Sequence, residues 1–122
     1  MLIQNYRDLE AWQVSMDFVV EVYRLTKRFP REEMYGLTNQ LRRAAIEIPS
    51  NLSEGHQRGT KAYAHFVSVA IGSLAEAETQ MEIARRVLLV SDTDLKNVHE
   101  VALSLRRLLF GLRRSLARKN SN

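Results

Sequence analysis

Residues 37–55 read LTNQLRRAAIEIPSNLSEG, and this stretch decides the fold. Its apolar side chains recur every three or four residues, which is the period of one face of a helix: Leu37, Leu41, Ala44, Ile48 and Leu52. Pro49 lies inside this pattern, where a proline deletes one backbone donor and leaves the carbonyl of Ala45 without its usual partner. Because the pattern continues past Pro49, we expect a helix that bends there and ends near Gly55. The freed backbone groups are expected to bond the side chains of Ser50, Asn51 and Ser53.

Three further segments have the same helical period, and none shows the alternation of a strand. Pro30, Thr60 and the SDTD sequence at 91–94 mark their limits. The expected helices cover residues of about 9–29, 33–54, 60–90 and 92–118. Short connections favour antiparallel neighbours. The sequence therefore predicts a single all-α domain over 1–122, an antiparallel up-down-up-down four-helix bundle with its second helix kinked at Pro49.

The first and third expected helices each have an unusual face. The first has apolar residues on two sides, whereas a surface helix of a monomer needs only one apolar side. It therefore lies deep in the bundle or faces a second subunit. The third has many small residues and includes Gly72, which costs about 1 kcal/mol of helix propensity relative to alanine. We expect close helix packing to compensate for this glycine.

The composition excludes several classes of protein. The 122 residues contain no cysteine, which removes disulfides and thiol chemistry and suits a reducing compartment. The first residues lack the pattern of a signal peptide, and no apolar segment approaches the roughly 20 residues that cross a bilayer. We expect a cytoplasmic protein without a membrane segment.

The sequence offers no pattern for catalysis or cofactor binding. Di-iron bundles use Glu-x-x-His pairs, and none occurs around His56, His65 or His99. A glycine-flanked serine elbow and a phosphate-binding glycine loop are also missing from the sequence. We therefore expect a protein that is not an enzyme, with no catalytic residue, no cofactor and no metal.

The positive charge is concentrated at the end of the chain. The net charge is +4, yet residues 1–100 hold 12 basic and 14 acidic side chains, while residues 101–122 hold 6 basic and no acidic ones. Such asymmetry indicates a polyanionic partner, or else cations that oppose the dipole at the end of a helix. The candidates for binding nucleic acid are Arg106, Arg107, Arg113, Arg114, Arg118 and Lys119.

An apolar line, Leu103 and Phe110, lies between these arginines on the side of the helix away from the core. It could dock a second subunit, with arginines meeting Asp17 and Glu21, or receive nucleic acid, with Phe110 stacking on a base. The subunit hypothesis also explains the second apolar side of the first helix. Its interface candidates are Val14, Phe18, Val22, Leu103 and Phe110.

Polar residues on the second and third helices form a separate group. Residues four apart on a helix can pair, as Arg43 and Glu47 do by position. We expect a structural network that fixes the helix register rather than a catalytic site. Its members are Arg43, Glu47, Asn51, Glu54 and Glu78.

Several segments resemble one family. They are WQ at 12–13, FP at 29–30, EMYGLTNQLRRAAIEIPSNLSEG at 33–55 and FVSVAIGSLAEAE at 66–78. Together they resemble, from about Tyr6 to Arg118, the four-helix-bundle proteins named for intervening sequences in 23S ribosomal RNA genes. Glu47 departs from this resemblance, because a small residue such as serine is expected there.

This resemblance implies a bundle that assembles into a ring of five subunits. The family also resembles the accessory protein of diversity-generating retroelements, a basic pentamer that binds nucleic acid and a reverse transcriptase. The resemblance also suggests association with RNA or the ribosome. The first hypothesis is therefore an oligomeric, nucleic-acid-binding protein that uses its basic last helix. The alternative is a protein-interaction scaffold whose basic helix serves subunit assembly or an acidic protein partner.

Overall fold

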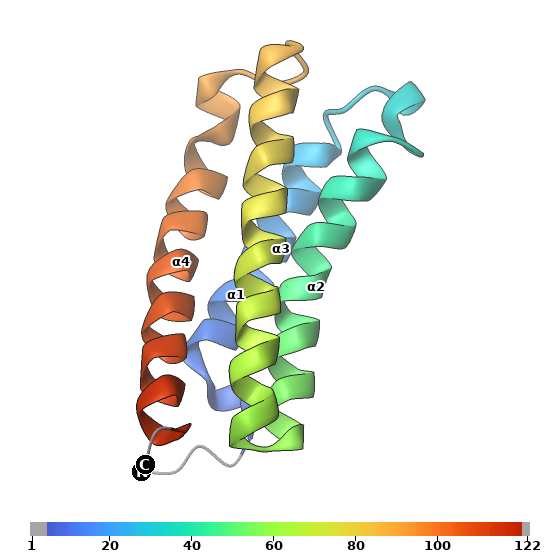
Figure 1. Cartoon of the computed structure of the whole chain (residues 1–122). Helices are drawn as coiled ribbons and strands as arrows, with labels where there is room; N and C mark the ends of the chain where they lie inside the picture. The colour runs from blue at the N-terminus through green and yellow to red at the C-terminus, as the bar shows by residue number, and fades with distance from the viewer. Residues whose placement is uncertain (1–4, 121–122) are drawn as a thin grey trace.

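The structure is a computed structural model that describes residues 5–120. It contains the helices α1 (Glu10–Thr26), α2 (Leu37–Arg58), α3 (Thr60–Arg86) and α4 (Asp92–Asn120), with short 3-10 helices η1 (Tyr6–Asp8) and η2 (Arg31–Glu33) (Figure 1). No strand occurs between residues 5 and 120. The predicted all-α four-helix bundle is confirmed.

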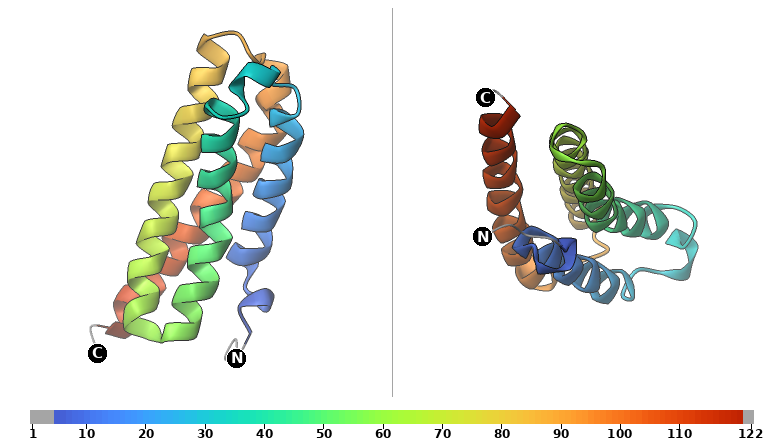
Figure 2. Two further views of the ribbon diagram at one scale, coloured as in Figure 1. Left: turned by 90° about the vertical axis from the view of Figure 1, so that its right-hand side faces the viewer. Right: turned by 90° about the horizontal axis from the view of Figure 1, so that it is seen from below.

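Consecutive helices run in opposite directions (Figures 1 and 2). α2 and α3 pack most extensively, α1 packs against α2 and α4, and α3 packs against α4. The start of α1, the α2–α3 turn and the end of α4 lie at one end of the bundle, called the lower end below. The α1–α2 and α3–α4 connections lie at the opposite, upper end.

Apolar faces of all four helices form the core. The predicted face of α2 is buried as expected, including Leu41, Ile48 and Leu52. The largest buried side chains from the other helices are Phe18, Val22, Val67, Leu74, Met81, Leu95, Val98, Leu105 and Leu109. Burial of a Leu or Phe side chain contributes about 1.5–3 kcal/mol, so this set accounts for much of the driving force for folding.

The junction between α2 and α3 differs from the prediction. α2 does not end near Gly55; it continues to Arg58, and Gly59, with φ 103°, breaks the helix. Gly55 is buried inside α2, where a Cβ atom would lie 2.6 Å from the Cβ of Phe66. This glycine therefore permits close approach of α3 and does not terminate the helix.

The upper-end connections also shift the predicted boundaries. α1 ends at Thr26, and α2 begins at Leu37, where the Glu33 carboxylate accepts a hydrogen bond from the Leu37 amide at 3.3 Å. α3 ends at Arg86, because Leu88 adopts the left-handed conformation with φ 65°. A glycine usually occupies that position after a helix. Here it is a leucine that is 87% exposed.

α2 continues through Pro49 as one helix. The neighbouring side chains bond carbonyls other than the one that Pro49 frees on Ala45: Ser50 donates to Ile46, Asn51 to Glu47 and Ser53 to Ser50, at 2.9, 2.7 and 3.0 Å. The prediction that these side chains bond the backbone group freed by Pro49 is therefore wrong for the Ala45 carbonyl. The bend itself stays a prediction.

Gly72 does not serve the role expected from the sequence. It is exposed on α3, and a Cβ atom added there would have no neighbour within 4 Å. Close helix packing occurs at Gly55 instead.

Candidate nucleic-acid interface

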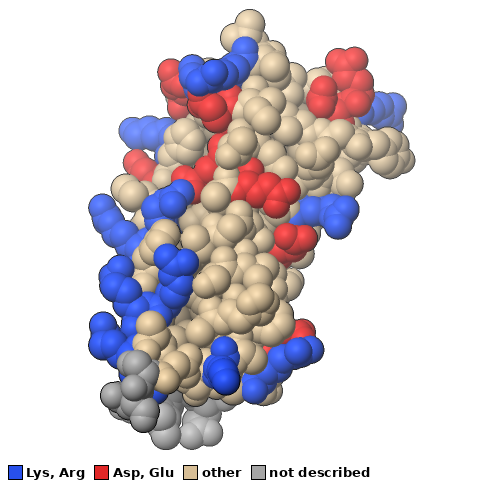
Figure 3. Space-filling model, in the orientation of Figure 1, with Lys and Arg blue, Asp and Glu red and all other residues tan. Residues whose placement is uncertain are grey.

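Lysine and arginine side chains gather over the lower half of α4 (Figure 3). Arg107, Arg114, Arg118 and Lys119 are exposed, and Arg113 is half-buried. Within residues 5–120, Arg107, Arg113 and Arg114 form no ion pair with a carboxylate. Their charge is therefore available to an external anion.

Arg106 differs from the other candidates because it already has a partner. Its guanidinium forms an ion pair and hydrogen bond with Glu78 of α3. The pair joins two helices across 28 residues of sequence. Its first role is therefore structural. The remaining basic residues of this segment, Arg107, Arg113, Arg114, Arg118 and Lys119, are called the α4 basic surface below.

The predicted apolar line is present but is partly covered. Leu103 is 50% exposed, whereas Phe110 is half-buried beneath Arg113, whose guanidinium carbon lies 4.7 Å from the ring centre. Such a cation–π contact attracts the guanidinium to the face of the ring. The result is a positive charge held over an aromatic ring on α4.

The interface candidates on α1 separate into two groups. Phe18 and Val22 are 0% exposed and pack in the core of this chain, so they offer no surface to a second subunit. Their expected role at an interface is wrong. Val14 is half-buried and lines a hollow of about 250 Å³ between α1 and α4, together with Asp17, Glu100, Val101 and Ser104.

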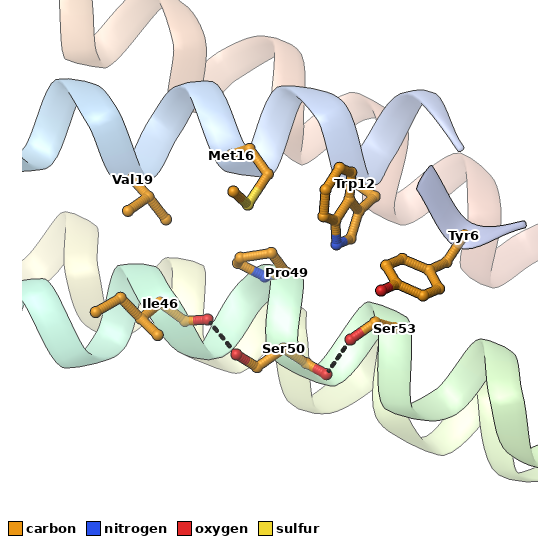
Figure 4. Close-up of a pocket in the computed structure, with 8 residues that line it drawn as sticks. All are labelled: Tyr6, Trp12, Met16, Val19, Ile46, Pro49, Ser50 and Ser53. Carbon is orange, nitrogen blue, oxygen red and sulfur yellow. Dashed lines mark hydrogen bonds between the residues drawn. The ribbon is translucent and has the colours of Figure 1, made fainter. Parts of the chain in front are cut away.

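A second hollow, of about 270 Å³, lies between α1 and α2 (Figure 4). Side chains of α1 point toward Pro49 of α2 across it, with Tyr6 at its lower end. Its remaining lining residues are Trp12, Met16, Val19, Ile46, Ser50 and Ser53. Trp12, Met16 and Val19, with Val20, which is 47% exposed, are the second apolar side of α1 that the sequence indicated.

The five polar residues predicted to form one network do not come together as one group, although the Asn51 side chain donates a hydrogen bond to the Glu47 carbonyl. Glu47 accepts a hydrogen bond from Ser73 of α3 at 3.2 Å, so the residue that departs from the family pattern links α2 to α3. Glu54 pairs with Arg58 at 2.7 Å, and Glu78 pairs with Arg106. Arg43 is exposed. The structure thus has separate pairs in place of the network.

Charges at the upper end are neutralised among themselves. Glu82 accepts hydrogen bonds from Arg85 and Arg86, which lower its pKa to about 2. Asp94 accepts a hydrogen bond from the Ser91 amide at 2.9 Å and pairs with Arg28, and these contacts lower its pKa. These two carboxylates are therefore neutralised by arginines of the same end.

Tyr63 and Gln80 each have a buried polar atom without a hydrogen-bond partner among the described residues, the Tyr63 hydroxyl and Gln80 Oε1. Burial raises the pKa of Tyr63 to about 12, so this phenol stays protonated. Among residues 5–120, no three His, Cys, Asp or Glu side chains come together in a way that could hold a metal ion.

Sequence reasoning missed two features of the lower end. Arg7 lies over the rings of Tyr6 and Trp12, and Arg58 lies over Phe66. These contacts join residues whose spacing follows no single helical period. The sequence showed only that arginine and aromatic residues occur near the start of the first helix and near the junction of the second and third.

The fold and surface define a class of protein: an all-α bundle with a basic last helix. None of the helices between residues 5 and 120 has the length and apolarity to span a bilayer. The family model described as "23S rRNA-intervening sequence protein" matches residues 7–111. The chain belongs to this family.

A solved structure from Bacteroides thetaiotaomicron has a similar fold. It is a protein of unknown function from the S23 ribosomal protein family, and it is 18% identical to this chain with a TM-score of 0.76. The match covers 84% of this chain and 97% of that one. At this identity the likeness shows the fold alone. No curated protein sequence matches the chain.

Proposed function

We propose that this chain is a non-enzymatic, cytoplasmic protein that assembles into an oligomer, a pentamer by family resemblance, and binds RNA through α4. The observation that carries the proposal is the α4 basic surface, where Arg107, Arg113 and Arg114 have no carboxylate partner within the described residues. Unpaired arginines bind phosphates and release the counterions of a nucleic acid. The family description, which refers to 23S rRNA, favours RNA over DNA.

Exposed apolar side chains of α1 support the oligomer. Met16, which lines the apolar hollow between α1 and α2, and Val20 would both be left in water in a monomer. A subunit interface would cover these side chains. Arginines from several subunits would then be brought together, and the affinity for a long polyanion would rise through multiple contacts.

The test is a binding measurement at several salt concentrations. Fluorescence anisotropy of labelled RNA should show binding at about 50 mM salt and a loss of about 10³-fold or more by about 200 mM if six or more phosphates are contacted. Little sequence preference is expected, because phosphate contacts carry no sequence information. If no RNA or DNA binds even at low salt, the proposal is wrong.

A second candidate is a protein-interaction scaffold, and the hollow between α1 and α4 favours it. This hollow combines apolar Val14 and Val101 with the carboxylates of Asp17 and Glu100. Neither carboxylate pairs with a basic group of residues 5–120. They could receive arginines of a neighbouring subunit. The α4 basic surface would then be used in assembly instead of RNA binding.

A further inference from the structure

Arginines stacked on aromatic rings are concentrated in the lower half of the bundle. The Arg7 guanidinium carbon lies 5.8 Å from the ring centre of Tyr6 and 5.7 Å from that of Trp12. Arg58 lies 5.4 Å from Phe66, and Arg113 lies 4.7 Å from Phe110. These three stacks are called the arginine–aromatic pairs below.

The three pairs come from different segments of the chain. The first belongs to η1 and the start of α1, the second to the end of α2 and the start of α3, and the third to the second half of α4. The antiparallel topology brings all three segments toward the lower end. All three pairs therefore lie in the lower half of the bundle, where Figure 3 also shows lysine and arginine side chains.

A fourth stack, Arg42 on Tyr23 at 4.3 Å, has a different role. It lies between the upper parts of α1 and α2, and Arg42 Nε donates a hydrogen bond to the buried Thr26 hydroxyl at 2.8 Å. This arginine is fixed by the fold. No comparable bond to a buried group holds Arg7, Arg58 or Arg113 within the described residues.

A hollow lies between the first two pairs. Its volume is about 320 Å³, and Tyr6, Ser53, Glu54, Gln57 and Arg58 line it. Glu54 pairs with Arg58 at 2.7 Å, so its charge is neutralised inside this hollow. The walls thus offer an aromatic face, hydroxyl and amide groups, and a guanidinium plane, which suit stacking on and hydrogen bonding to a heterocyclic base.

These features distinguish between the two forms of nucleic acid. A duplex presents phosphates to arginine but keeps the faces of its bases stacked inside. A single strand presents both phosphates and base faces, and unpaired bases stack on aromatic rings and on guanidinium planes. We propose that the lower end, with its three arginine–aromatic pairs, selects single-stranded nucleic acid over duplex. This inference rests on the proposed function and adds the class of ligand.

The first experiment compares a single strand with a duplex of the same length, as both RNA and DNA, at about 50 mM salt. The affinity for the single strand should be at least about tenfold higher, the contribution of one stacked base. Equal affinities, or tighter duplex binding, would overturn the inference and leave the proposed function standing. Absence of binding to every probe would overturn the proposed function itself.

Trp12 supplies an internal readout, because it is the only tryptophan of the chain and belongs to one of the pairs. The single strand should quench its fluorescence, since a stacked base lies close to the indole, whereas the duplex at equal saturation should not. Equal quenching by both probes would contradict the proposed selection. This measurement needs no substitution and so does not depend on the folding of a variant.

Two substitutions test the rings directly. Phe110→Leu and Tyr6→Leu keep apolar side chains but remove the stacking surface, so each should reduce single-strand affinity by about tenfold and leave duplex affinity unchanged. Tyr35→Leu is the matched control, because Tyr35 is 96% exposed at the upper end. If both lower-end variants keep the full preference for single strands over duplex, or if the control loses that preference, the arginine–aromatic pairs are not its cause.

Discussion

Gly55 of α2 lies so close to Phe66 of α3 that a Cβ atom on the glycine would be 2.6 Å from the Cβ of the phenylalanine. Because the Tyr63 Cα would be only 3.2 Å away, a rotamer change cannot relieve the contact. Gly55→Ala should therefore separate the two helices and lower the free energy of unfolding by about 1–3 kcal/mol. Urea unfolding followed by circular dichroism measures this loss.

Gly72→Ala is the matched control for that substitution. Gly72 lies in the middle of α3 with no atom within 4 Å of an added Cβ. Alanine there should raise the free energy of unfolding by about 1 kcal/mol, because helix propensity is the only property that changes. Destabilisation by this substitution would indicate that another subunit packs against Gly72 in solution.

The α4 basic surface predicts a specific change in salt dependence. Replacing Arg107 and Arg114 together by alanine should reduce the slope of log affinity against log salt by about two, one for each lost phosphate contact. Binding should weaken to a similar extent for all sequences. Lys27→Ala is a suitable control, since Lys27 is exposed just after α1 at the upper end, whereas the α4 basic surface lies in the lower half of α4. An unchanged slope in the double variant would remove these arginines from the interface.

The pair formed by Arg106 and Glu78 predicts how assembly and binding separate. Arg106→Glu places two carboxylates together, and Glu78→Arg in the same chain should restore the pair and the unfolding midpoint.

If the scaffold hypothesis holds, Arg106→Glu and Arg113→Glu should each dissociate the oligomer, as sedimentation would show. Variants that stay fully oligomeric but no longer bind RNA would contradict the scaffold hypothesis and favour the proposed function.

The carboxylates of the upper end predict loss of stability in acid. Arg85 and Arg86 lower the pKa of Glu82 from 4.5 to about 2, so the native state favours the charged form. The stabilisation is present above pH 4.5 and disappears as the pH falls toward 2. The difference in thermal midpoint between the native chain and Glu82→Gln should shrink across this interval. A carboxyl resonance of Glu82 that titrates near pH 4.5 would show that the pairs do not persist in solution.

Pro49→Ala should straighten α2. The substitution restores an amide donor for the Ala45 carbonyl, which the proline leaves without its helical partner. A crystal structure of the variant should show this hydrogen bond and a smaller bend between the two halves of α2. If the helix axis is unchanged, the bend is imposed by packing against α1 and not by the proline.

The helical period was sufficient to predict four helices and the buried face of α2, since both follow from local spacing. It could not distinguish Gly55 from Gly59, because a glycine that ends a helix and one that permits close packing look alike in sequence. The ion pair of Arg106 with Glu78 also could not be predicted from the helical period. Its residues lie 28 positions apart, and their contact depends on the register between α3 and α4.

Burial of Phe18 and Val22 shows a related difficulty. Two apolar sides of α1 were evident, but periodicity does not say which side faces the core. The arginine–aromatic pairs were unpredictable for a similar reason, because each depends on how a helix end is placed against its neighbour.

The antiparallel topology has a practical consequence for handling this protein. The start of η1 and the end of α4 lie at the same end of the bundle as the arginine–aromatic pairs (Figure 2). An affinity tag or fluorescent fusion joined close to the start of η1 or the end of α4 would therefore be near the arginine–aromatic pairs. An insertion between α3 and α4, near the exposed Leu88, would carry a label at the opposite end and leave those pairs open to a ligand.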